Sequence, residues 1–194
     1  LGGVRSSAQM ISYEISIGFS VAGVLLISES LRPIAIVESQ YGWMWNAIIQ
    51  PIGFITFLVS AFAETNRLPF DLPEAEPELV GGYHTEYSST KFAAFFLAEY
   101  ANMIISSGLI VTLYLGGWQV PYIEKLGLST GLQTLIQVAA FFFKVGFMLF
   151  FFIWVRWSIP RFKYNQLMNL GWKVMFPLSL INLIWVALLV MWLN

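Results

Sequence analysis

Three charged residues lie inside long apolar segments of this 194-residue chain: Glu14, Glu99 and Lys144. At the centre of a membrane, three such charges facing lipid would cost roughly 8–10 kcal/mol on insertion scales. We therefore expect them to face a bundle interior, another subunit or water. Carboxylates and an amine placed there can take up and release protons, which indicates a proton or ion path. The alternative is one or two structural ion pairs, for example Glu99 with Lys144.

Helical spacing gives these charges polar neighbours. Glu99, Asn102 and Ser106 follow one another at i, i+3 and i+7, so they share one helix face. Another stripe runs along the first apolar segment: Ser6, Gln9, Ser12, Ser16 and Ser20. A stripe of small hydroxyl residues is more typical of helix packing than of a path. Glu14 points about 160° away from it at 100° per residue.

An acidic loop is expected at residues 65–90. The run AETNRLPFDLPEAEPELVGGYHTEY (63–87) contains six acids and one strong base, Arg67. Prolines at every fourth position from Pro69 to Pro77 prevent one continuous helix. The Leu, Phe and Pro content favours a loop that docks against partner subunits and carries protonatable acids toward a membrane path. A solvated loop and a divalent-cation site remain alternatives, although the spacing matches no EF-hand.

Five apolar segments must position these residues, and each is near the ~20 residues that a membrane-spanning helix needs. They are about 8–31, 46–64, 91–115, 131–155 and 174–193. Lipid permits only helices and closed barrels to span it, and the segments lack the alternation of barrel strands. We therefore expect an all-α integral membrane protein, a single transmembrane helical domain of five helices with the long acidic loop on its inner side.

Lysine and arginine predict the orientation, because cytoplasmic loops are enriched in both. If the first helix begins inside, two basic residues face outward, Arg32 and Lys125. Seven face inward: Arg5, Arg67, Lys91, Arg156, Arg161, Lys163 and Lys173. This distribution places the loop 65–90 and the basic segment 156–173 on the cytoplasmic side or its equivalent.

Composition excludes several classes of protein. The chain is 58% hydrophobic and only 11% charged, against about 25% charged in a soluble domain. With a net charge of −1, it has no basic footprint for nucleic acid. It has no cysteine and one histidine, His84, so cysteine-ligated clusters and bis-histidine haem are excluded and no metal site is expected. Any redox centre is expected in partner chains. Because the chain starts at Leu1 without a signal peptide, we expect it to begin inside a longer protein.

Several motifs together resemble the NuoH family, the membrane subunit of respiratory complex I (NADH:quinone oxidoreductase) that forms the quinone channel. Beside the loop run 63–87, they are GGVRSSAQMISYE (2–14), FFLAEYANM (95–103), YLGGW (114–118) and IPRFKYNQLMNLGWK (159–173). They cover almost the whole chain. The family has three more N-terminal helices, so this chain resembles its C-terminal five.

The resemblance implies a subunit that binds the quinone and couples quinone reduction to proton translocation, without a redox centre of its own. It assigns the following acids to proton coupling: Glu14, Glu64, Asp71, Glu74, Glu76 and Glu99. Lys144 joins them from its place inside an apolar segment. The residues expected on the quinone route are Arg67, Phe70, Asp71, Phe96 and Arg156.

The resemblance also implies partners and a location. Quinone is the expected substrate, no cofactor is covalently bound, and FMN and iron–sulfur clusters are expected in partner subunits. The partners are hydrophilic quinone-module subunits, antiporter-like membrane subunits and membrane lipid. The bacterial plasma membrane is the expected location, with an organellar inner membrane as the alternative. Alternative functions are the equivalent subunit of a membrane-bound hydrogenase, a structural anchor and a stand-alone ion transporter. The last predicts an internal repeat that the sequence does not show.

Overall fold

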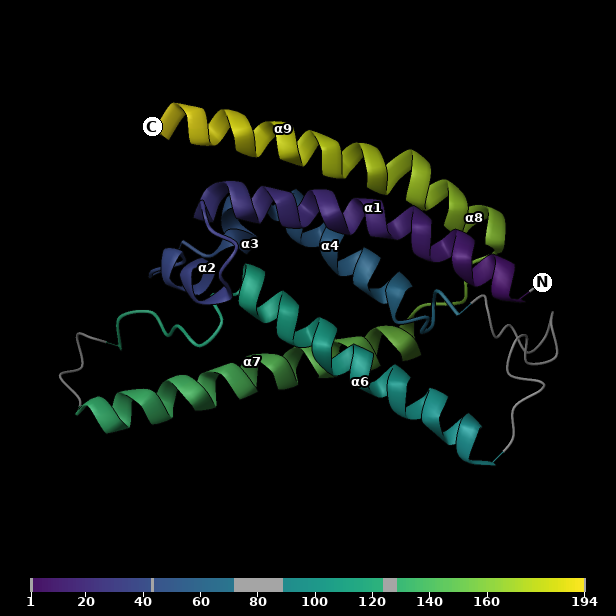
Figure 1. The fold of residues 1–194 in the computed structure, drawn as a ribbon, viewed down its shortest axis with the longest axis horizontal. Helices are drawn as coiled ribbons and strands as arrows, with labels where there is room; N and C mark the ends of the chain where they lie inside the picture. The colour runs from purple at the N-terminus through teal and green to yellow at the C-terminus, as the bar shows by residue number, and fades with distance from the viewer. Residues whose placement is uncertain (1, 43, 72–88, 124–128, 194) are drawn as a thin grey trace.

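The structure is a computed structural model that describes residues 2–42, 44–71, 89–123 and 129–193; all regular structure in these ranges is helical (Figure 1). The α-helices are α1 (Gly2–Ser28), α2 (Pro33–Ser39), α3 (Asn46–Ile49), α4 (Pro51–Glu64), α6 (Ser89–Tyr114), α7 (Thr130–Ser158), α8 (Tyr164–Asn169) and α9 (Phe176–Leu193). A π-helical segment, Leu170–Met175, joins α8 to α9 without a break.

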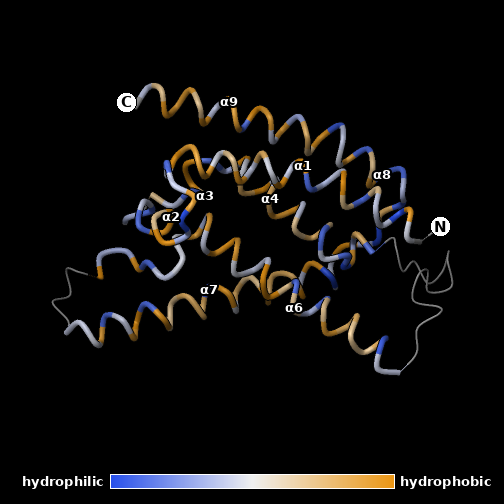
Figure 2. Tube along the Cα trace, viewed as in Figure 1, coloured by the Kyte–Doolittle hydropathy of each residue, from blue (hydrophilic) through white to orange (hydrophobic). Residues whose placement is uncertain are grey.

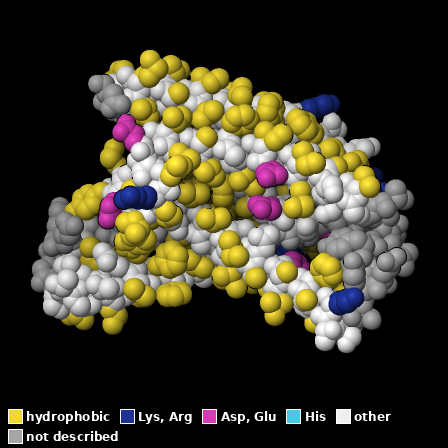
Figure 3. All heavy atoms as spheres, viewed as in Figure 1, with side chains coloured by type: hydrophobic (Ala, Val, Ile, Leu, Met, Phe, Trp, Pro, Cys, Tyr) yellow, Lys and Arg dark blue, Asp and Glu magenta, His cyan; other side chains and the backbone are white. Residues whose placement is uncertain are grey.

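Within the described residues, four helical runs are long and apolar enough to cross a membrane: Gly3–Ser28, Ser89–Tyr114, Thr130–Ser158 and Tyr164–Trp192. The helix α4 is apolar and shorter. Hydrophobic residues recur along the whole length of these helices (Figure 2). The face in Figure 3 is largely hydrophobic, with a few charged side chains between. The prediction of an all-α membrane protein is confirmed.

Helices α1, α4 and α9 pack against one another, and α6 and α7 form a pair that crosses beneath them (Figure 1). The start of α1, the end of α4, the start of α6, the end of α7 and α8 lie together at one end of the molecule (Figure 1). We call this the site end. It gathers the chain segments that hold most of the residues expected to function.

The second apolar segment, expected as one helix over 46–64, is broken at Gln50. Gln50 has φ −129° and ψ 70°, outside the helical region, and Pro51 is the first residue of α4. Proline disfavours a helical conformation in the residue before it, which explains the break.

The last apolar segment is longer than the expected 174–193, because the helical run already begins at Tyr164. The backbone N–H of Lys163 donates to Gln166 Oε1 at 3.1 Å. This is one half of the capping arrangement that starts a helix. Part of the basic segment 156–173 is therefore helix rather than loop.

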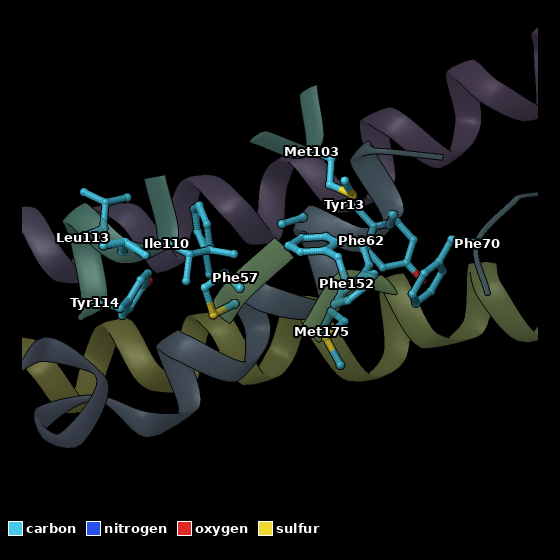
Figure 4. Packing of buried hydrophobic residues seen from close by; sticks show 14 of the residues in the cluster. Tyr13, Phe57, Phe62, Phe70, Met103, Ile110, Leu113, Tyr114, Phe152 and Met175 are labelled. Carbon is cyan, nitrogen blue, oxygen red and sulfur yellow. The ribbon is translucent and has the colours of Figure 1, made fainter. Parts of the chain in front are cut away.

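The apolar core joins the helices through aromatic contacts (Figure 4). At the site end, the ring centroids of Tyr13 and Phe70 are 5.7 Å apart. Phe62 of α4 lies 4.1 Å from Phe152 of α7 by the same measure. Each such pair adds about 0.5–1.5 kcal/mol beyond its buried area. The first contact fixes the chain after α4 against α1, and the second fixes α4 itself against α7.

The serine stripe of α1 is a packing face, as its composition suggested. Gln9, Ser12, Ser16 and Ser20 are buried, and Ser20 Oγ lies 2.7 Å from Thr56 Oγ1 of α4. Small side chains let two helices approach closely. The other face of α1, which holds Glu14, is exposed.

Candidate functional site

The chain that follows α4 is held against α1 by one amide. Gln9 Nε2 donates to the carbonyl oxygens of Ala63 at 2.7 Å and Phe70 at 3.0 Å, and to Asn66 Oδ1 at 3.2 Å. Gln9 is fully buried. The non-helical turn after Glu64 is thus positioned by a side chain more than fifty residues earlier in the sequence.

This turn presents Arg67 to α6. Arg67 Nε lies 2.5 Å from Glu99 Oε1, with side-chain exposures of 5% and 25%. The guanidinium carbon is also 4.2 Å from the ring centroid of Tyr100. A guanidinium suits both partners, because it donates along fixed directions and stacks on aromatic faces. Two consecutive residues of α6 therefore hold one buried positive charge.

A second ion pair fixes the end of the same turn. Arg161 Nη2 lies 2.8 Å from Asp71 Oδ2. Beside it, the backbone N–H of Phe162 donates to the Pro69 carbonyl at 3.2 Å. The segment after α7 is thereby joined to the turn after α4.

These contacts surround a small cavity of about 60 Å³. The cavity has room for a few water molecules. Its lining residues are Asn66, Arg67, Leu68, Asp71, Phe96, Glu99 and Arg156. Two carboxylates and two guanidiniums around water-sized space can hold water and pass protons through it. Five of the residues expected to function meet here: Arg67, Asp71, Phe96, Glu99 and Arg156.

The same turn also lines an apolar groove of about 270 Å³. Pro69 and Phe70 line it together with side chains of α4, α7 and the π-helical segment, for example Leu58, Phe151 and Met175. It has almost no polar surface. Phe70, expected on the quinone route, thus lines an apolar groove, while its neighbour Asp71 lines the polar cavity.

The remaining acids expected in coupling lie elsewhere. Glu14 and Glu64 are exposed and close enough to interact electrostatically. They do not line the cavity with Glu99. Glu74 and Glu76 are outside the described residues, as is most of the acidic loop.

Lys144 and Glu99 bind different partners. Its ammonium group donates to the carbonyl oxygens of Leu115 at 2.8 Å, Gly117 at 3.0 Å and Gln119 at 2.8 Å. It also lies 4.7 Å from the ring centroid of Trp45. The structure therefore pairs Glu99 with Arg67 and leaves Lys144 at the far end of α6, instead of joining Glu99 to Lys144.

Sequence reasoning missed several residues of the site, among them Gln9, Tyr100 and Arg161. Gln9 belonged to the stripe interpreted as packing. Tyr100 follows Glu99 directly, and Arg161 counted only as an orienting charge. Proximity to Asp71 or Arg67 was the missing information, and helical periodicity does not supply it. Among the described residues, no group of three histidine or acidic side chains can hold a metal ion.

The apolar helical runs define an integral membrane protein. Its polar site is the cavity at one end of the bundle, which is lined by charged side chains. The chain belongs to the NADH dehydrogenase family, which is the NuoH family of membrane proteins, because the family's model matches residues 1–187.

The relatives agree with this assignment, and all three named here are subunits of an NADH-quinone oxidoreductase. The chain is 55% identical over 199 residues to subunit 8 from Rhodothermus marinus, covering 97% of this chain and 58% of the relative. It is 54% identical over 198 residues to the NuoH-type subunit from Salinibacter ruber, covering 97% and 57%. It is 50% identical over 184 residues to a NuoH-type subunit from Cytophaga hutchinsonii, covering 95% and 54%. The chain thus spans a little over half the length of these curated relatives.

Proposed function

We propose that the chain is part of the membrane subunit of a proton-pumping NADH:quinone oxidoreductase, where it forms part of the quinone tunnel and couples quinone reduction to proton translocation. The single observation that carries this proposal is the cavity around the Arg67–Glu99 pair. It combines a buried ion pair with an adjoining apolar groove, and the printed names of the relatives supply the reaction.

The groove and the cavity suit the two parts of a quinone. An isoprenoid tail is apolar, and the groove beside Phe70 offers it apolar walls. A quinone ring carries two carbonyl oxygens that accept hydrogen bonds, and Arg67 and Arg156 at the cavity supply donors. The cavity itself is too small for the ring, so the ring would lie at its mouth and exchange protons through its water.

Coupling follows from the charge that reduction creates. A quinone takes up two protons with two electrons, so protons leave the neighbouring groups and negative charge develops near the cavity. That charge attracts Arg67 and weakens its pairing with Glu99, which then takes up a proton that enters from the aqueous side through the water of the cavity. Glu64 and Glu14, which interact with each other, pass the change onward. The acidic loop, with Asp71, Glu74 and Glu76, responds by a change of charge or hydration that shifts a two-state element.

The expected partners follow from this function. Electrons arrive through FMN and iron–sulfur clusters held by hydrophilic subunits, and antiporter-like membrane subunits lie beyond the carboxylates. The bacterial plasma membrane is the proposed location, since the relatives come from bacteria. Affinity purification of the tagged full-length subunit is expected to recover an NADH-oxidising module. Recovery of a hydrogenase module instead would contradict the proposal.

The coupling role is tested by Glu99→Gln in the assembled complex. Glutamine keeps the shape and can still accept from Arg67, but it cannot take up a proton. Proton pumping, followed with a pH-sensitive dye in membrane vesicles, is expected to fall about tenfold, as for a lost contribution of about 1.4 kcal/mol. NADH:quinone reductase activity is measured on the same vesicles.

Glu38→Gln is the matched control, because Glu38 is an exposed acid on α2, away from the cavity. It is expected to leave both activities unchanged. Wild-type pumping and reductase activity in Glu99→Gln would remove Glu99 from the mechanism.

A further inference from the structure

An apolar groove lies at the end of the molecule opposite the site end, where the function proposed above places no residue. It has a volume of about 420 Å³ and lies between the C-terminal ends of α1 and α9, beside α3 (Figure 1). Its apolar walls include Ile27 of α1, Ile49 of α3 and Leu189 of α9. The volume falls within the range of about 300–1,000 Å³ that is typical of small-molecule sites.

A second groove of about 340 Å³ continues the first along α9, because Leu189 and Trp192 line both. Trp185 and Leu188 complete the walls of the second groove. These four residues are spaced i, i+3, i+4 and i+7, so they share one face of the helix. We call the two grooves together the α9 groove. An elongated apolar surface of this kind suits a flexible hydrocarbon chain.

The helix ends that border the α9 groove are not buried by this chain. Val186 is the last buried residue of α9 within 176–192, and Val24 is the last buried residue of α1 within 3–28. Trp192, near the end of α9, is 85% exposed. Tryptophan is enriched where the hydrocarbon of a membrane meets its headgroups, because the ring is amphipathic. The α9 groove is therefore expected at the membrane interface, where lipid surrounds it.

One carboxylate stands at the α9 groove, that of Glu29, which directly follows α1 and lines the groove. Among the described residues, no hydrogen bond or ion pair holds this carboxylate. The backbone of Glu29 has φ 51°, a left-handed conformation that glycine adopts more easily at the end of a helix. Strain of this kind is found where a side chain has a function, which points to a ligand for the carboxylate.

Glu29 and Arg32 together present one negative and one positive charge beside the groove. Arg32 lies three residues after Glu29, immediately before α2, and is exposed. The segment between them is held by its own bonds. Ser28 Oγ donates to the Ser30 carbonyl at 3.2 Å, and the Arg32 N–H donates to Ser30 Oγ at 3.2 Å. The two charges are thus carried by one ordered segment at the mouth of the groove.

A zwitterionic headgroup complements these two charges. A primary ammonium group donates up to three hydrogen bonds and suits a carboxylate, and a guanidinium group suits a phosphate. Phosphatidylethanolamine carries both groups on one headgroup. Phosphatidylglycerol carries the phosphate but offers Glu29 no cation.

We propose that the α9 groove binds phosphatidylethanolamine. One acyl chain lies against Leu189 and Trp192, the ammonium group binds Glu29, and the phosphate binds Arg32. The distribution of lysine and arginine predicts that this end faces away from the cytoplasm, so the lipid comes from the outer leaflet. The bound lipid fastens the end of α9 to the end of α1.

The test compares two photoactivatable lipids in vesicles that contain the assembled complex with the full-length subunit. One is a phosphatidylethanolamine with a diazirine in its acyl chain, and the other is a phosphatidylglycerol with the same chain at the same mole fraction. Mass spectrometry of the peptides is expected to show stronger labelling of residues 185–192 by phosphatidylethanolamine. In Glu29→Gln this labelling is expected to fall about fivefold, as for the loss of one exposed ion pair.

Glu38→Gln is the matched control, because Glu38 is an exposed acid on the neighbouring helix α2 and does not line the groove. It is expected to keep the wild-type labelling. Equal labelling by the two lipids in the wild-type complex, or undiminished labelling in Glu29→Gln, would overturn the proposal.

Leu189→Trp tests the groove separately from the headgroup. The larger side chain fills the groove, so labelling of residues 185–192 by phosphatidylethanolamine is expected to fall while the complex stays assembled. Undiminished labelling would overturn the place given to the acyl chain. A cryo-EM map of the wild-type complex is expected to show lipid density between the ends of α1 and α9, and a protein helix in that place would overturn the proposal. Labelling requires no turnover, so its outcome is independent of the proposed quinone reaction.

Discussion

Single side chains at the site end each hold more than one chain segment. Gln9 binds both Ala63, at the end of α4, and Phe70 beyond the turn. Arg67 binds Glu99 and stacks on Tyr100. Buried polar groups that lose a partner cost more than the bond itself contributes, because they are left without water. The geometry of the cavity therefore depends on a few residues that are not themselves expected to exchange protons.

Gln9→Met tests this dependence. Methionine has a similar length but no donor, so the carbonyls of Ala63 and Phe70 lose a partner. We expect the segment 65–71 to be destabilised by about 1–3 kcal/mol. Faster amide hydrogen exchange over 65–71, measured by mass spectrometry of the assembled complex, is the readout. Met10→Leu, at the exposed next position, serves as control. Unchanged exchange in Gln9→Met would show that the amide does not hold the turn.

At the scale of helices, Lys144 joins α7 to the end of α6. The last carbonyl groups of a helix lack partners within it, and a positive charge near a helix C-terminus is favourable. The ammonium group lies just beyond this C-terminus, where it donates to the carbonyl oxygens of Leu115, Gly117 and Gln119 in the segment that follows α6. These contacts account for a charge inside an apolar segment without a proton path.

Lys144→Met is expected to remove these bonds while keeping the length of the side chain. Because bonds to a charged donor contribute about 1.5–3 kcal/mol, the thermal midpoint of the solubilised complex should fall. Protons moved per quinone reduced should stay normal in the complex that remains assembled. A reduced pumping ratio with unchanged thermal stability would instead place Lys144 in the proton path.

At the scale of the whole molecule, basic residues are distributed unevenly between the two ends. The site end holds the start of α1 with Arg5 and the end of α7 with Arg156, whereas Arg32 precedes α2 at the opposite end (Figure 1). The excess of lysine and arginine on cytoplasmic loops predicts that the site end faces the cytoplasm. The cavity would then open toward the cytoplasm, the side of the proposed electron input.

Cysteine labelling tests this orientation, since the chain contains no cysteine of its own. Lys163→Cys, at the site end, is expected to react with a membrane-impermeant maleimide in inverted vesicles. Glu38→Cys, on α2, is expected to react only in right-side-out vesicles. The reverse pattern would invert the topology and place the cavity on the side away from the proposed electron input.

The sequence alone determined that the protein lies in a membrane and that its spanning segments are helices. An 11% share of charged residues and apolar segments near twenty residues long leave little choice but membrane-spanning helices. Helical periodicity also identified the buried stripe from Gln9 to Ser20, because side chains on one helix face are fixed by local geometry. Motifs carried the family resemblance, which the family model confirmed.

Only the tertiary structure decided which charges meet. Periodicity places Glu99 on a face of its helix, but it says nothing of the register or crossing of that helix with segments far away in the sequence. Arg67 reaches Glu99 and Arg161 reaches Asp71 because the turn after α4 is held against α1 by the side chain of Gln9. Lys144 likewise binds carbonyls of a distant loop rather than an acid. The pairing of buried charges therefore depends on packing between helices, which no local pattern encodes.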